Sequence, residues 1–219
     1  MNQISTEAKL LIGTGLATLL ILVGGIFFLS KNDQKAVEQT TKPVDAGVLV
    51  RSDSNKIATD SAKVTVVEFG DYQCPACRIA QPVVKKILSD YAGKINFVFR
   101  NFPLPQHQIA LLAAESAEAA GEQGKYWEMN DKLYETQEDW SGSNDALNKF
   151  AGFATDLKLD VEKFKKSVQE NKFADKIQKD SADGNSLGVN STPTFYVNGI
   201  KLNSFSYENF KSKIEANLK

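Results

Sequence analysis

Cysteine and histidine are scarce in this chain, which has two cysteines and one histidine among its 219 residues. A structural zinc site takes four ligands, most often cysteine and histidine, and His107 has no companion histidine to complete such a set. Basic residues are not in excess either, because the formal net charge is −1. The sequence also has no lysine-rich or arginine-rich stripe, internal repeat or low-complexity tract, so it predicts neither a metal site nor nucleic-acid binding.

Charge is missing from one long segment, Leu10–Leu29, which lies between two lysines. Twenty helical residues rise about 30 Å, and this length matches the hydrocarbon core of a bilayer. The segment is apolar all round, which argues against a buried core helix. Bulky residues also stand at its end, where a signal peptidase needs small ones. The sequence therefore predicts an uncleaved transmembrane helix over 10–29.

The rest of the chain divides by composition into a short tail (1–9), a polar and flexible linker (30–46) and a folded domain (47–219). A content of 42% hydrophobic and 24% charged residues is typical of a globular chain. The charges on the two sides of the transmembrane helix nearly balance and do not set its orientation. The short tail fits a signal-anchor, which predicts that the folded domain lies outside the cytoplasm.

Both cysteines lie in one motif, Cys74-Pro75-Ala76-Cys77, directly after the apolar run Val64–Phe69 and before a stretch with helical spacing. Residues at i and i+3 share one face of a helix, so the two sulfurs can come within bonding reach. Free N–H groups and the positive dipole end at a helix N-terminus favour a thiolate, which makes Cys74 the expected nucleophile. Cys77, one turn further in, is the expected resolving cysteine.

A structural disulfide and half of a zinc site are the alternatives for this motif. A bridge that closes so short a loop removes little entropy from the unfolded chain, so it would stabilise the fold poorly. The zinc alternative lacks two ligands. The position of the motif at a strand-to-helix junction therefore favours redox chemistry.

Hydrophobic spacing predicts a mixed α/β chain whose strands and helices come in a definite order. A short edge strand is expected at 48–50, and longer strands at 64–69, 95–102, 194–197 and 200–202, the last two joined by the hairpin turn Asn198-Gly199. A helix should run from the cysteines to near Gly93, bent by Pro82. The remaining helices are expected at 110–120, around 126–134, at 146–157, after Asp160 as N-cap, at 173–187 and at 207–218.

This order resembles the DsbA-like thiol:disulfide oxidoreductases, which have a thioredoxin fold with a helical insertion. The similarity rests on Val-Glu-Phe-Gly-Asp-Tyr-Gln-Cys-Pro-Ala-Cys (67–77), on the helical block at about 104–188, and on Ser-Thr-Pro-Thr-Phe-Tyr-Val-Asn-Gly (191–199). It covers about 48–219. The resemblance implies an α/β, thioredoxin-like domain that follows the transmembrane helix and carries a redox-active Cys74–Cys77 disulfide.

The resemblance also implies roles for three residues outside the cysteine motif. Pro193 would follow a cis bond in a loop opposite Cys74, where Thr192 presents its backbone to an extended substrate; a plain turn is the alternative. Glu68 would be a buried acid that moves the proton of Cys77, unless the strand end opens to water there. The sequon at Asn190 would place a sugar on this loop, so we treat it as chance.

Two features need separate interpretation. Relatives that oxidise strongly often have Pro-His between the cysteines, and this chain has Pro-Ala. Without that histidine we expect a depressed pKa for Cys74 but a less oxidising pair. His107 precedes a predicted helix, where a solvated or helix-start histidine is expected, so we place it outside the site.

The sequence thus predicts a membrane-anchored, extracytoplasmic enzyme that forms disulfides in exported proteins and needs no metal or nucleotide cofactor. Disulfide chemistry has its usual place outside the cytoplasm. The catalytic residues would be Cys74, Cys77 and Glu68, and Thr192 and Pro193 would bind substrate. Reduced or misoxidised exported proteins are the expected substrates, and a separate membrane redox partner would recharge the dithiol. A reductase or isomerase, and a non-catalytic peptide-binding or holdase module, remain alternatives.

Overall fold

A computed structural model describes residues 42–219. The predicted tail (1–9), the predicted transmembrane helix (10–29) and most of the predicted linker lie outside the described residues. Within 42–219, every helix is too short or too polar to cross a membrane.

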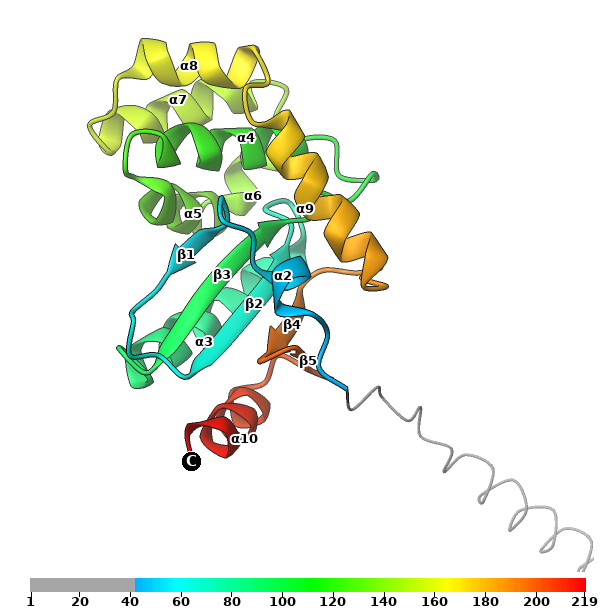
Figure 1. Cartoon of the computed structure of the whole chain (residues 1–219). Helices are drawn as coiled ribbons and strands as arrows, with labels where there is room; N and C mark the ends of the chain where they lie inside the picture. Colours follow the sequence, from blue (N-terminus) through cyan, green and yellow to red (C-terminus); the bar gives the residue numbers. More distant parts are fainter. Residues whose placement is uncertain (1–41) are drawn as a thin grey trace, which may run out of the picture. The chain divides into compact units, whose positions relative to one another are not determined.

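Five strands form one sheet in the order β1-β3-β2-β4-β5 (Figure 1). They are β1 (Asn55–Ile57), β2 (Val64–Gly70), β3 (Ile95–Asn101), β4 (Thr194–Val197) and β5 (Ile200–Lys201). β2 and β3 run parallel, and the other neighbouring strands are antiparallel. Parallel central strands are buried on both faces, which explains their nearly continuous apolar sequences. The predicted parallel strand-helix-strand unit is confirmed.

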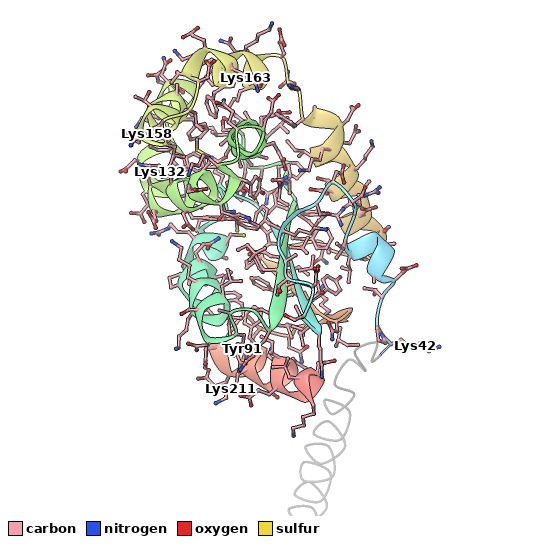
Figure 2. The ribbon with its side chains drawn as sticks, turned by 60° about the vertical axis from the view of Figure 1, so that its left-hand side comes forward. Lys42, Tyr91, Lys132, Lys158, Lys163 and Lys211 are labelled. Atoms are coloured by element: carbon pink, nitrogen blue, oxygen red, sulfur yellow. The ribbon has the colours of Figure 1, made fainter. Side chains whose placement is uncertain are left out.

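Helices cover both faces of this sheet. On one face, α3 (Pro75–Asp90) and α10 (Tyr207–Leu218) pack against the sheet through a common apolar core. Figure 2 shows Tyr91, which follows α3, beside α10, and the Tyr91 hydroxyl donates to Glu215 at 3.1 Å. On the other face, α2 (Ala46–Leu49) and the end of α9 (Ala174–Ser186) pack over the sheet. Gly184 allows this close approach, because a Cβ there would lie 2.6 Å from the Phe102 ring.

The helical insertion lies between β3 and β4 and forms one end of the domain (Figure 1). It consists of α4 (Ala110–Gly121), α5 (Tyr126–Glu135), α6 (Gln137–Trp140), α7 (Ala146–Asp156), α8 (Val161–Gln169) and α9. The alanine-rich α4 is central and contacts α5, α7, α8 and α9. Lys132, Lys158 and Lys163 project from the outer side (Figure 2). The five predicted helices are confirmed, as is the Asp160 cap, which accepts from the Lys163 N–H at 2.9 Å; α6 was not predicted.

The predicted edge strand at 48–50 is wrong, because Val48 and Leu49 belong to α2, Val50 is its C-cap, and the edges of the sheet are β1 and β5. The Asp45 side chain caps α2 by accepting from the Gly47 N–H at 2.7 Å. The guanidinium of the buried Arg100 then binds the carbonyls of Val48 and Leu49 at 2.8 and 2.7 Å. The carboxylates of Asp180 and Asp183 pair with the charge of Arg100, and the two carbonyls accept from its remaining nitrogen, so a distant side chain contributes to the local structure here.

Two other predicted features turned out as follows. The helix α3 ends at Asp90, three residues before Gly93, and it includes Pro82 without interruption. The predicted hairpin turn is confirmed, since Asn198 and Gly199 both have positive φ (45° and 83°) between β4 and β5. Two consecutive positive φ values give the twist that a two-residue hairpin needs.

Candidate active site at the start of α3

The two cysteines occupy the junction between β2 and α3. Cys74 is the N-cap of α3, and Pro75 takes the first helical position, where a missing N–H costs nothing. The Cys74 carbonyl accepts the first helical hydrogen bonds, from the Cys77 and Arg78 amides at 3.1 and 3.3 Å. Both thiols are free, with Cys74 7% exposed and Cys77 fully buried. Only the first sulfur can therefore be reached from the surface.

The two sulfurs differ in acidity. The facing Cys77 thiol contributes most to lowering the pKa of Cys74 from its ordinary 9.0 to about 5, and the Cys77 and Ala76 amides add to this effect against desolvation. Burial raises the pKa of Cys77 well above its ordinary value, and the negative charge of Glu68 acts in the same direction. The sequence argument predicted the direction for Cys74, but it gave the leading role to the helix N-terminus and not to the second thiol.

The Thr192-Pro193 loop lies directly against the nucleophile. The bond between these residues is cis, as the family resemblance implied. The Cys74 thiol donates to the Thr192 carbonyl at 3.4 Å. A groove of about 370 Å³ begins here and runs between Ala76, the loop and residues 201–205, where Phe205 supplies an apolar wall. Thr192 and Pro193 thus line an open groove, and Cys74 contacts Thr192 beside it.

Glu68 is fully buried in β2, so the alternative of a strand end open to water is excluded. Neither carboxyl oxygen has a hydrogen-bond partner within residues 42–219. Desolvation, followed by the charge of Cys74, raises the pKa of Glu68 to about 8. A carboxyl group with this pKa is mostly protonated at neutral pH and can donate a proton.

His107 lies three residues before α4, as the sequence suggested, but it is not simply solvated. Its side chain is 20% exposed, and Nδ1 lies 2.7 Å from Oδ2 of the buried Asp71. Asp71 precedes Cys74 by three residues, so His107 is linked to the redox turn (71–74) through one side chain.

Two glutamines that the sequence analysis missed also hold the redox turn. The Gln137 amide, on the unpredicted α6, donates to the carbonyls of Tyr72 and Cys74 at 2.7 and 2.9 Å. Gln73 donates to the Ser141 carbonyl and accepts from the Ile109 amide, both at 2.7 Å. Only the position of Gln73 next to Cys74 could have indicated its importance. Gln137 lies far along the chain and has no motif around it.

The arrangement supports thiol-disulfide exchange. An accessible sulfur that is ionised at neutral pH can exchange with an external disulfide, and a buried sulfur one turn away can close the bond. The buried Glu68 carboxyl is close enough to interact electrostatically with both cysteines. Within residues 42–219, no group of three or more histidine, cysteine or acidic residues gathers where it could hold a metal ion.

Comparison with known proteins gives a consistent result. A thioredoxin family model matches residues 55–216. The probable disulfide bond formation protein D of Bacillus anthracis is 32% identical over 211 residues, which cover 92% of each chain. The crystal structure of oxidised BdbD from Bacillus subtilis matches with a TM-score of 0.69 and 31% identity, over 75% of this chain and 92% of that one.

A second group of relatives shares only part of its length with this chain. The Na(+)/H(+) antiporter NhaA 1 of Salinispora arenicola is 40% identical over 139 residues. This match covers 63% of this chain but 20% of the antiporter. The chain therefore spans about a fifth of the length of these curated relatives.

Proposed function

Because this chain belongs to the thioredoxin family, and within it to the DsbA-like thiol:disulfide oxidoreductases, we propose that it forms disulfides in exported proteins by exchange through Cys74 and Cys77. The observation that carries the proposal is the difference between the two sulfurs. Cys74 is surface-accessible and has a pKa of about 5, whereas Cys77 is buried and has a raised pKa.

The reaction begins with the oxidised enzyme. A substrate thiolate attacks the Cys74 sulfur, the Cys74–Cys77 bond breaks, and its electron pair leaves with Cys77. The buried Cys77 thiolate takes a proton from Glu68. A second substrate thiolate then attacks the substrate sulfur of the mixed disulfide and releases the Cys74 thiolate. The substrate loses two electrons, and the enzyme is left as a dithiol.

The acidity of Cys74 favours this direction over reduction. A stable thiolate stabilises the reduced enzyme, so the disulfide form is the better oxidant. The two pH units between a pKa of about 5 and pH 7 stabilise the reduced form by roughly 3 kcal/mol, or roughly 60 mV. This stabilisation of the reduced enzyme is lost as the pH falls through 5, because Cys74 is protonated there and no longer a thiolate.

Substrate binding is assigned to the groove at Thr192 and Pro193. An extended segment of an unfolded protein can hydrogen-bond to backbone at the loop while its cysteine faces Cys74. Phe205 and Leu202 offer apolar contacts next to it. Recognition of this kind depends little on sequence, which suits an enzyme that acts on many exported proteins.

Localisation and recharging complete the proposal. We place the folded domain outside the cytoplasm, tethered by residues 10–29, since an uncharged stretch of this length fits a bilayer. The chain has no third cysteine, so a separate membrane redox partner must reoxidise Cys74 and Cys77.

The test uses the full-length protein and a reduced, unfolded secretory protein. Oxidised enzyme should restore activity to this substrate. Cys74→Ser should abolish turnover. Cys77→Ser has no internal disulfide, so its Cys74 thiolate should instead attack a disulfide of the oxidised substrate, release the other substrate sulfur as a thiolate and accumulate as a mixed disulfide. Normal turnover in Cys74→Ser would mean that the domain acts only as a binding module.

A further inference from the structure

Asp71 has a buried carboxylate that the proposed reaction does not use. The residue is 1% exposed and stands three positions before Cys74. Its Oδ1 accepts from the Gln73 amide at 2.7 Å. Its Oδ2 accepts from the Leu104 amide at 2.8 Å and lies 2.7 Å from Nδ1 of His107. Three contacts therefore fix this side chain between the redox turn and the start of the insertion.

The backbone of Asp71 faces both cysteines. Its carbonyl accepts from the Cys74 amide at 3.1 Å. Its own N–H donates to the sulfur of Cys77 at 3.5 Å. Sulfur hydrogen bonds are longer than those to oxygen, and this one is aimed at an atom that has no exposed surface. The amide of Asp71 is thus the donor that the structure places on the resolving sulfur.

We propose that Asp71 is a positioning residue for the Cys77 half of the exchange: its clamped carboxylate holds its own backbone N–H against the Cys77 sulfur, and His107 holds that carboxylate in place. The proposal rests on disulfide exchange at Cys74 and Cys77, but it does not depend on which protein is the substrate or on the direction of the reaction.

The reason lies in where negative charge develops. When an external thiolate attacks Cys74, a new sulfur–sulfur bond forms there and the electron pair of the old bond moves to Cys77. A thiolate in a buried site is costly unless a donor already faces it. With both thiols free, the Asp71 N–H faces the Cys77 sulfur, so a donor is present where the thiolate forms. Glu68 then supplies the proton. By microscopic reversibility, the same N–H assists Cys77 when it attacks Cys74.

The test measures how fast glutathione opens the Cys74–Cys77 disulfide of the full-length protein. A hydrogen bond to a charged group is worth enough to change this rate about tenfold. We expect Asp71→Asn to slow opening by about this factor, because an amide NH₂ replaces the oxygen that faces the Leu104 N–H. His107→Ala should slow opening in the same direction. His107→Asn should keep most of the rate, since its amide nitrogen can replace Nδ1 as the donor.

A second measurement separates positioning from loss of structure. Alkylation of reduced Cys74 reports on the first sulfur alone, so its pH profile should stay the same in all variants. Asp60→Asn removes an exposed carboxylate elsewhere and should leave both measurements unchanged. The proposal is overturned if glutathione opens every variant at the normal rate. It is also overturned if Cys77 becomes open to alkylation in step with the slowing, which would show a loosened fold.

If Asp71→Asn does not fold, the comparison between His107→Ala and His107→Asn decides the question by itself. Equal rates in His107→Ala and His107→Asn would then overturn the role of the clamp. Because glutathione replaces the protein substrate, these results hold even if the exported-protein function proves wrong. Failure of the proposed function would instead appear as normal glutathione opening with no turnover of a reduced protein.

Discussion

The contribution of the second thiol to the acidity of the first can be tested by Cys77→Ala. In the structure, the Cys77 thiol is the largest cause of the lowered pKa of Cys74. A hydrogen bond to a charged group contributes about 1.5–3 kcal/mol, and one pKa unit corresponds to about 1.4 kcal/mol. Removing the thiol should therefore raise the pKa of Cys74 from about 5 by roughly one to two units.

The assay is the rate of Cys74 alkylation as a function of pH, with the modified residue identified by mass spectrometry. Only the thiolate reacts, so the rate follows its titration. Cys77→Ser is the matched variant, because its hydroxyl can still donate to the Cys74 sulfur. Its titration should lie between those of the wild type and Cys77→Ala.

An unchanged titration in Cys77→Ala would refute this assignment. The amides at the start of α3 would then account for the acidity, as the sequence argument supposed. An equal rise of the Cys74 pKa in Cys77→Ser and Cys77→Ala would also count against it. The serine hydroxyl is a donor and alanine has none, so equal rises would show that a donor at position 77 does not affect the pKa.

Three further predictions concern residues around the cysteines. The pKa of Glu68 is raised to about 8, so between pH 4.5 and pH 7 the stability of the wild type should fall by about 3 kcal/mol relative to that of Glu68→Gln. Urea unfolding of both proteins at both pH values checks this, because the titration of Cys74 is common to the two and cancels in the comparison. Ala76→His should raise the reduction potential measured against glutathione, and an unchanged or lower potential would contradict it. Gln137→Ala leaves the buried Tyr72 carbonyl without this donor and should cost about 1–3 kcal/mol in denaturant unfolding, compared with no change in the exposed Gln169→Ala.

The sequence predicted the parts of the fold that depend on local pattern. The central strands β2 and β3 are continuous apolar runs, and α3 repeats its apolar residues every three or four positions, so neighbours in sequence determine both. The hairpin depends on Asn198-Gly199, where positive φ is easily adopted. The cis bond before Pro193 came from the family resemblance, because X-Pro bonds in general are rarely cis.

The errors have a different origin. Val48, Leu49 and Val50 have good strand propensity, but in the helical turn of α2 the carbonyls of Val48 and Leu49 both accept from the buried Arg100. Nothing near residue 48 reveals this contact, because Arg100 lies 52 residues further along the chain. Propensity is a weak predictor wherever a buried charge has to be satisfied by backbone.

The same reasoning explains why half of the site was missed. The residues proposed to react are chemically distinctive and could be named from the sequence, whereas the residues that hold them are ordinary amides and a carboxylate. The residues of the insertion that hydrogen-bond to the redox turn all lie within 104–141. They are Leu104, His107, Ile109, Tyr126, Asn130, Gln137 and Ser141. The thioredoxin core supplies the two cysteines and Glu68, and residues of the insertion hold the turn that carries Cys74. Substitutions in the insertion should therefore change redox properties even where they touch neither sulfur.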